Sequence, residues 1–285
     1  MLEGELRSQA EVRLALVKGE WARAESLGVE LERDPTANTF RRVRAGVAVA
    51  GAHAARGQVR AAHRALEGAR ALAVEDGNVE YTSLVVRTEL TLAMTSGEGI
   101  TSRPLPAFVD TLTAAQLAAA TGDTSRARRL LAALRVPDRS TTGIDVRRHH
   151  VEGTIAAVRG DWAMVIELLG QVARDGVPLA AGGQALRWLV ANAHERLGRP
   201  DSAATYFDLV TSYTRLGIGP LLTYGITYSF AHQRLVLLYA RMGRLEDARR
   251  HWKIFSETFT NPDPEFKHLV DEAREALLTA ERERG

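Results

Sequence analysis

Seven glycines recur along this chain at nearly constant spacing: Gly19, Gly57, Gly97, Gly122, Gly160, Gly198 and Gly243. The intervals between them are 38, 40, 25, 38, 38 and 45 residues. Each glycine follows one apolar, helix-like stretch and precedes another. Repetition at this period predicts stacked pairs of antiparallel helices, because a single pair cannot bury its apolar face alone.

Fixed offsets from these glycines predict which side chains pack the pairs. Five residues after the glycine, six of the seven repeats carry a small residue, which would let the second helix of a pair approach the first closely. These residues are Ala24, Ala62, Ala127, Val165, Ala203 and Ala248. Seven residues before the glycine, on the first helix, stand Val12, Ala50, Leu90, Ala115, Gly153, Ala191 and Val236. We expect both sets to face the core.

The interval from Gly97 to Gly122 is too short for a complete pair. A first helix is predicted at 81–96, but Gly99, Pro104 and Pro106 interrupt the place where its second helix should follow. We therefore predict an incomplete third repeat, with a loop over 97–106. Such a break would leave part of the stack uncovered or available to a partner.

The end of the sequence predicts a capping helix over 264–284. Asp263 stands at the expected N-cap, Pro264 at the first helical position, and Phe266 begins an apolar face. A stack of helix pairs needs such a helix to cover its last apolar surface. The whole of 1–285 is accordingly predicted to be one all-α unit.

Composition narrows the function classes. The formal net charge is +2, with acids and bases interleaved, so no field for nucleic acid is expected. There is no cysteine, which excludes disulfides, thiolate metal sites and cysteine nucleophiles. The longest nearly apolar run, 45–55, is too short to span a bilayer, and no signal peptide is recognised at the start. The expected location is the cytoplasm, with no membrane span.

The pattern resembles the tetratricopeptide repeat (TPR) family. The best match runs from Leu235 to Phe266 and includes Leu-Tyr-Ala-x-x-Gly at 238–243, Glu-Asp-Ala at 246–248, Trp252 and Pro262. The C-terminal half is similar to the repeat region beside the kinase domain of some bacterial serine/threonine kinases, although no kinase motif is present. The resemblance implies a right-handed α-solenoid that binds proteins, in bacterial signalling or complex assembly.

No residue cluster predicts catalysis. His149, His150 and Glu152 lie together, but a metal site would need a second set of ligands at helical spacing. No phosphate-binding glycine loop occurs, and no histidine has an evident nucleophilic partner. Arginine clusters at 41–44 and 126–129 are read as solvated helix faces. We expect no enzyme, no metal and no cofactor.

In the TPR family the concave surface is lined by fixed positions of each first helix. Carried onto this chain, those positions predict a peptide- or protein-binding groove of Arg147, His150, Thr154, Trp188, Asn192, Phe230 and Gln233. Trp188 could equally pack between repeats, since core and interface aromatics look alike in sequence. The expected function is a protein–protein interaction scaffold. The alternative is a structural subunit of a larger complex or homo-oligomer, assembled through the surfaces of the stack.

Overall fold

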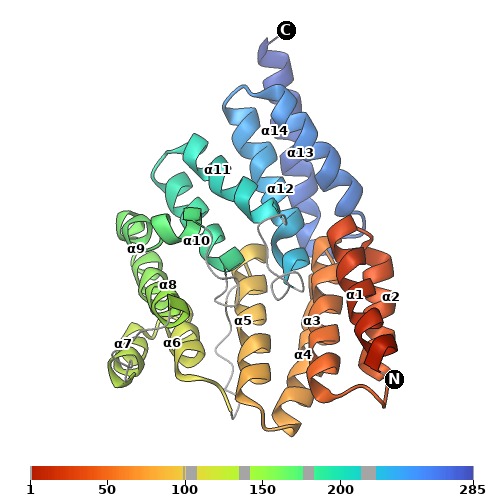
Figure 1. Cartoon of the computed structure of the whole chain (residues 1–285). Coiled ribbons are helices and arrows are strands. Elements are labelled where there is room, and N and C mark those ends of the chain that lie inside the picture. Colours follow the sequence, from red (N-terminus) through yellow and green to blue (C-terminus); the bar gives the residue numbers. More distant parts are fainter. Residues whose placement is uncertain are drawn as a thin grey trace.

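The computed structural model describes residues 2–98, 100, 108–134, 142–175, 183–212 and 223–284. Over these residues the protein is all-helical, and consecutive helices pack side by side in pairs (Figure 1). The pairs are α1 (Leu2–Lys18) with α2 (Trp21–Arg33), α3 (Thr39–Ala55) with α4 (Val59–Glu75), α6 (Thr111–Ala120) with α7 (Thr124–Ala133), α8 (Thr142–Val158) with α9 (Trp162–Asp175), α10 (Gly183–Arg196) with α11 (Pro200–Thr211), and α12 (Tyr224–Arg241) with α13 (Leu245–Thr258). The helix α5 (Val79–Ser96), the 3-10 turn η3 (Pro264–Phe266) and α14 (Lys267–Arg284) complete the described chain.

The predicted turn glycines all adopt the left-handed conformation. Their φ angles lie between 67° and 86°, a region that residues with a Cβ atom rarely adopt. An eighth left-handed glycine, Gly77, joins α4 to α5. The offset pattern missed it because it follows the second helix of a pair rather than the first.

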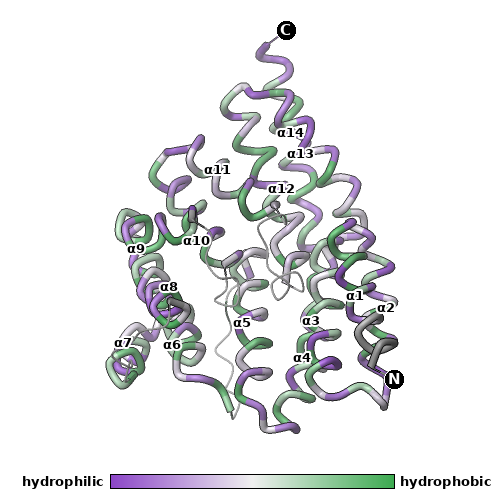
Figure 2. Tube along the Cα trace, viewed as in Figure 1, coloured by the Kyte–Doolittle hydropathy of each residue, from purple (hydrophilic) through white to green (hydrophobic). Residues whose placement is uncertain are grey.

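The predicted core faces are confirmed. All six small residues at the fifth position after a glycine are fully buried, including Ala62, Val165 and Ala248. Figure 2 shows hydrophobic and hydrophilic residues alternating along the helices, so each helix has an apolar side. Two residues that also face a neighbouring helix, His53 and Trp252, are only half-buried.

The third repeat lacks a second helix in the described chain. After α5 ends at Gly97, residues 98, 100 and 108–110 are not helical, and α6 begins at Thr111. Residues 99 and 101–106 of the predicted 97–106 loop lie outside the described residues. Breaks in the periodic pattern of the sequence also predict loops at 136–144, 175–183 and 216–225, and most of their residues lie outside the described chain as well. In each of these three loops a helix begins at or before the expected loop end: α8 starts at Thr142, α10 at Gly183 and α12 at Tyr224.

Two regions far apart in sequence lie against each other, which a simple stack of neighbours does not predict. The helix α12 packs across α3 and α5 (Figure 1). Gly225 approaches so closely that an added Cβ atom would overlap the carbonyl oxygen of Gly51. The Ser229 hydroxyl donates to the carbonyl oxygen of Ala55, and the Thr95 hydroxyl lies 3.4 Å from that of Ile226.

The segment after α13 extends this contact to the second turn of the fold. The Asp263 N–H donates to the Gly57 carbonyl oxygen over 2.9 Å, and the Arg60 side chain forms a two-pronged ion pair with Glu265 at 2.7 and 2.9 Å. We call the contact of α12 and residues 259–265 with α3 and residues 56–60 the closing seam.

Asp263 corrects one sequence expectation. Its side chain makes no hydrogen bond to its own following helix. Instead, its Oδ2 atom accepts the backbone N–H of Arg60 over 2.8 Å, at the second residue of α4. An acidic side chain distant in sequence therefore caps α4, and it also suits the positive end of that helix dipole.

The predicted capping helix is present as η3 and α14. Phe266, Ala273 and Leu277 are buried, and α14 packs against α12 and α13. No helix in the described part of the chain is long and apolar enough to cross a membrane.

Candidate functional site

Four of the seven residues predicted to line a concave groove are buried. His150, Trp188, Phe230 and Gln233 are each 3% exposed. Trp188 packs edge-on against Phe207 with ring centres 5.1 Å apart, and Gln233 donates to Glu272 of α14 over 3.0 Å. Phe230 is covered by Phe259 and Phe266 (ring centres 5.7 and 6.2 Å). These side chains pack between helices, so they offer little surface to a partner.

The other three are half-buried and bonded within the protein. The Thr154 hydroxyl donates to the His150 carbonyl oxygen over 2.8 Å, and the Asn192 amide donates to the Trp188 carbonyl oxygen over 3.0 Å. Arg147 donates to Asp110 over 2.6 Å. The predicted set therefore does not form one open groove.

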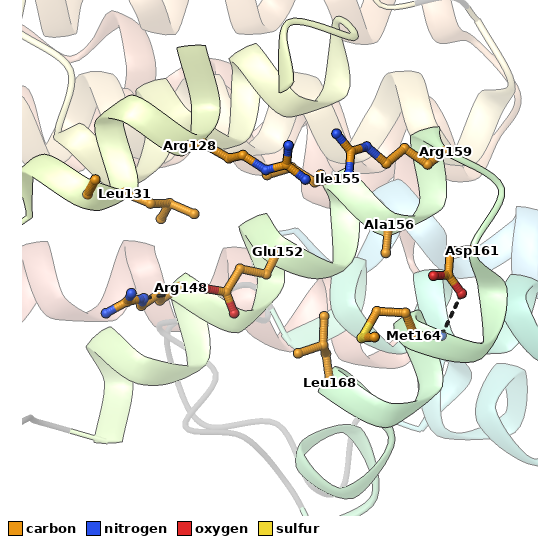
Figure 3. A pocket seen from close by; sticks show the side chains of 11 residues that line it. Arg128, Leu131, Arg148, Glu152, Ile155, Ala156, Arg159, Asp161, Met164 and Leu168 are labelled. Atoms are coloured by element: carbon orange, nitrogen blue, oxygen red, sulfur yellow. Dashed lines mark hydrogen bonds and ion pairs between the residues drawn. The ribbon is translucent and has the colours of Figure 1, made fainter. Parts of the chain in front are cut away.

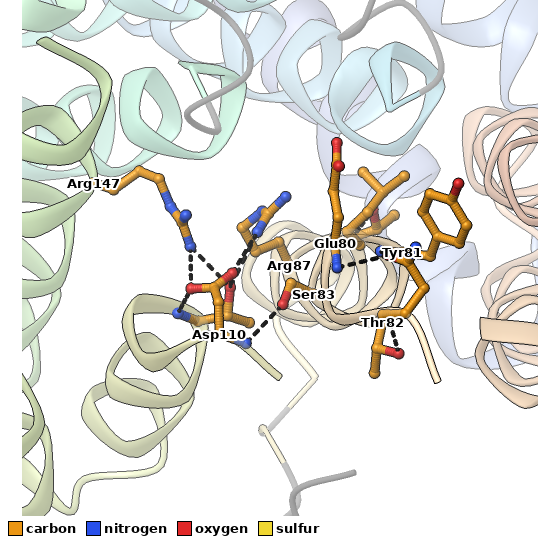
Figure 4. Close-up of polar contacts among 11 residues, drawn as sticks. Glu80, Tyr81, Thr82, Ser83, Arg87, Asp110 and Arg147 are labelled. Carbon is orange, nitrogen blue, oxygen red and sulfur yellow. Dashed lines mark hydrogen bonds and ion pairs between the residues drawn. The ribbon is translucent and has the colours of Figure 1, made fainter. Parts of the chain in front are cut away.

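Arg147 belongs to a polar junction that joins α5, α6 and α8 at the break in the repeats (Figure 4). Asp110 accepts from Arg147, from Arg87 over 3.3 Å, and from both the N–H and the hydroxyl of Thr113 over 2.9 Å. Its own N–H donates to the Ser83 hydroxyl over 2.9 Å. We call Ser83, Arg87, Asp110, Thr113 and Arg147 the polar junction.

Burial and neighbouring charge act in opposite directions on Asp110. Burial raises its pKa, but the Thr113 N–H and Arg147 outweigh that effect, so the pKa falls below its usual value. Burial and the nearby Arg147 lower the pKa of Arg87 to about 10. The junction thus holds two cations around one carboxylate, and the carboxylate must stay ionised to hold them together.

A hollow lies beside the polar junction, which we call the inner pocket. It has a volume of about 350 Å³ and is lined from α5, α6, α8 and α10, the start of α9 and the residues just after α5. Two of the predicted groove residues, His150 and Thr154, line it together with Gln116 and apolar side chains such as Leu90 and Leu189. Its position is the place where the missing second helix of the third repeat was expected to leave an opening.

A second concavity, the arginine groove, lies between α7, α8 and α9 (Figure 3). It has a volume of about 510 Å³. Apolar side chains form part of it: Leu131, Ala132, Ile155, Ala156, Met164 and Leu168. Arg128 and Arg159 lie along one side in Figure 3, with Met164 and Leu168 opposite. Met164 is 38% exposed and extends this apolar surface to the solvent.

The charges of the arginine groove are unequally paired. Arg148 lies 3.5 Å from Glu152, and Asp161 accepts the backbone N–H of Met164 over 3.1 Å. Arg128 and Arg159 are exposed and make no ion pair within the described ranges. The groove therefore carries a net positive charge beside an apolar surface.

A buried polar cluster joins α11, α12 and α13. The Nδ1 atoms of His232 and His251 are 2.8 Å apart, so one neutral ring donates to the other. Asp208 lies 3.5 Å from His251 Nε2 and accepts the Tyr239 hydroxyl over 2.7 Å. Burial lowers the pKa of His232 to about 3 and also lowers that of His251. Both rings are thus held neutral.

Metal binding finds no support in these clusters. In the part of the chain that the structure describes, no three His, Asp or Glu side chains are placed to hold a metal ion. Of the residues that stand together in the sequence on α8, His150 lies against Gln116 of α6, whereas Glu152 pairs with Arg148.

The sequence contained only a weak signal for the arginine groove. Arg128 lies in the 126–129 cluster that reads as a solvated face, and nothing in the repeat pattern distinguishes it from Arg126 or Arg129. Met164 occupies an outward position of α9 where a polar residue would be expected.

Comparison with known proteins adds no identification. No protein-family model matches the chain, and a search of curated proteins finds no significant match.

Proposed function

We propose that this protein is a protein–protein interaction module built as a TPR-like, right-handed α-solenoid. The left-handed glycine at every predicted turn and the buried small residue five positions later support the repeat assignment. Binding to a preformed surface requires little ordering of a stacked scaffold. The role fits assembly or signalling in a bacterial cytoplasm.

The arginine groove is the docking surface that we assign to the partner. One observation carries this assignment: an apolar surface with an exposed Met164 beside two arginines that lack an ion pair in the described chain. An amphipathic helix inserts its apolar face into such a groove. Its flanking residues should be acidic, because complementary charge steers and orients association. The partner is therefore an acidic amphipathic helix.

A designed peptide can test the groove before the natural partner is known. The probe is a fluorescein-labelled helix of leucines at i, i+3, i+4 and i+7 with glutamates elsewhere, and its binding is followed by fluorescence polarisation. Arg128→Glu with Arg159→Glu should weaken binding at least tenfold. The matched control is Arg126→Glu with Arg129→Glu, which changes the net charge equally through exposed arginines outside the groove.

A second pair of variants tests the apolar surface. Met164→Glu should weaken the peptide at least fivefold, whereas Leu197→Glu should not, although Leu197 is 37% exposed and comparable to Met164 at 38%. If both arginine pairs have equal effects, the groove is not the docking surface.

Other occupants give different results. Tighter binding of a DNA oligonucleotide than of the peptide, insensitive to Met164→Glu, would replace the protein partner with nucleic acid. A dimer in light scattering that Met164→Glu converts to a monomer would identify a second copy of this chain as the occupant. That result would favour the structural-subunit alternative.

A further inference from the structure

The inner pocket shares no lining residue with the arginine groove, and the two lie on opposite faces of α8. Arg148, Glu152 and Ile155 face the groove, whereas His150, Thr154 and Ala157 face the pocket. Their spacing follows the helical period, which separates the two sets by about half a turn. The pocket is thus a separate site with its own chemistry.

Most of the pocket wall is apolar, and two of the threonine hydroxyls in it are already hydrogen-bonded to their own helices. The Thr91 hydroxyl donates to the Arg87 carbonyl oxygen over 2.8 Å, and the Thr154 hydroxyl donates to the His150 carbonyl oxygen over 2.8 Å. Both hydroxyls use their hydrogen on their own helix. They have no donor left for a molecule in the pocket.

His150 on α8 and Gln116 on α6 supply hydrogen-bond donors, in addition to the indole N–H of Trp162 at the start of α9. His150 is 3% exposed, and burial together with Arg147 lowers its pKa to about 4, so at neutral pH the ring has one N–H and one acceptor nitrogen. The Gln116 Nε2 atom lies 3.4 Å from both ring nitrogens and can serve only the acceptor. Turning the amide over would instead satisfy the ring N–H and free the amide N–H groups. The pair offers an unused donor in either orientation.

Charge restricts the occupant further. Among the described residues that line the pocket, Glu98 alone has a formal charge at neutral pH, and it already accepts from His63 over 2.7 Å. No arginine or lysine lines the pocket in the part of the chain that is described. An anion placed there would lose its hydration without a cation to replace it.

We propose that the inner pocket binds a small, uncharged molecule with an apolar body and one carbonyl-type oxygen, which accepts a hydrogen bond from His150 or Gln116. The volume of about 350 Å³ lies in the range of small-ligand sites. This function goes beyond protein docking at the arginine groove and does not depend on it.

The test uses the neutral fluorophore N-phenyl-1-naphthylamine as the pocket probe. Its displacement is measured with two eight-carbon compounds, octanamide and octanoate. Octanamide should displace it at a concentration at least tenfold lower than octanoate at pH 8, because only the amide is uncharged. His150→Phe with Gln116→Leu should weaken octanamide about tenfold relative to the probe, the loss expected for one hydrogen bond.

Filling the pocket provides the structural control. Ala157→Trp should abolish probe binding, whereas Ala22→Trp, at an exposed position on α2, should not. Circular dichroism of both variants verifies that they are folded; if Ala157→Trp unfolds, the smaller Ala157→Leu takes its place and should weaken the probe at least fivefold. Equal displacement by octanoate and octanamide, or an unaffected probe in the folded filled variant, would overturn the proposal. Displacement by the acidic peptide would also overturn it, because the pocket would then belong to the docking surface.

Discussion

The closing seam and the polar junction are two ways of joining helices that do not form a regular pair. At the seam, α12 meets α3 through glycine and small residues, with main-chain oxygens accepting from Ser229 and from Asp263. At the junction, α5 meets α6 and α8 through a carboxylate between two arginines, and a hollow remains beside it. At the seam the main chains approach so closely that one added Cβ atom at Gly225 would overlap Gly51, whereas the polar joint adjoins a hollow of about 350 Å³.

The largest expected effect is at the seam. Gly225→Val should destabilise the protein by about 3 kcal/mol, because its side chain would overlap the main chain of Gly51, which cannot move aside as a flexible side chain could. Denaturant unfolding measures the change. Gly143→Ala is the control, since nothing lies within 4 Å of an added Cβ there, and it should be neutral or slightly stabilising. Equal behaviour of the two variants would show that the seam is not close-packed.

The loss of stability at low pH tests one buried histidine in each of the two regions. His232, on the seam helix α12, and His150, beside the junction, have pKa values lowered to about 3 and about 4, from an unfolded value near 6.5. Below pH 6.5 the unfolded chain therefore binds more protons, so stability falls with falling pH until the folded values are reached. Each histidine should cost about 2 kcal/mol between pH 7 and pH 5.

Single variants separate the two contributions. His232→Phe and His150→Phe should each make the pH dependence of unfolding less steep. The ring of His232 contacts His251 and Tyr228, and the charges of His251 and Arg250 oppose its protonation. His251 in turn lies against Asp208 and Tyr239. A profile that stays equally steep in both variants would contradict this prediction.

The junction should respond to removal of its one carboxylate. Asp110→Asn leaves Arg87 and Arg147 close together and partly buried, and should cost about 2 kcal/mol. Thermal unfolding of Asp271→Asn provides the comparison, because Asp271 forms an exposed pair with Arg274 and its loss should leave the midpoint unchanged. The junction variant should also change octanamide binding, since the pocket adjoins it.

The smallest effect concerns the cap of α4. Asp263→Ala should cost about 1 kcal/mol, the usual value for a lost N-cap, and Asp263→Asn should cost less because its side-chain oxygen can still accept. Hydrogen exchange at Arg60 would locate the change. Exchange that rises at Phe266 instead would show that Asp263 caps its own helix after all.

Local repetition made the helix pairs predictable, whereas contacts between distant repeats were not. Gly57 and Ala62 identify a turn and a packed face from sequence alone, because both requirements are local. The contact of Gly225 with Gly51 depends on the packing angles of all the helices in the 174 residues between them, and no local sequence pattern predicts the combined result. Phe230 and Gln233 are buried by the C-terminal segment, through Phe259, Phe266 and Glu272, which the repeat positions alone do not indicate.

The predicted site was partly located by the break in the repeats. His150 and Thr154 were predicted from their repeat positions, and they line the inner pocket beside the break. Gln116 was not, because its importance depends on the distance to His150 across two helices. The arginine groove has no repeat signature, since its exposed side chains Arg128, Arg159 and Met164 occupy surface positions that the repeat does not constrain.

The cap that Asp263 gives to α4 has a consequence for synthesis of the chain. Arg60 and Asp263 are 203 residues apart, so at about 5–20 residues per second the ribosome needs about 10–40 seconds to produce the second after the first. During that interval α4 has no side-chain cap and α3 has no α12 to cover it. The early helix pairs therefore leave the ribosome in an unfinished state that a chaperone could recognise, and they reach their final form only when the late residues arrive.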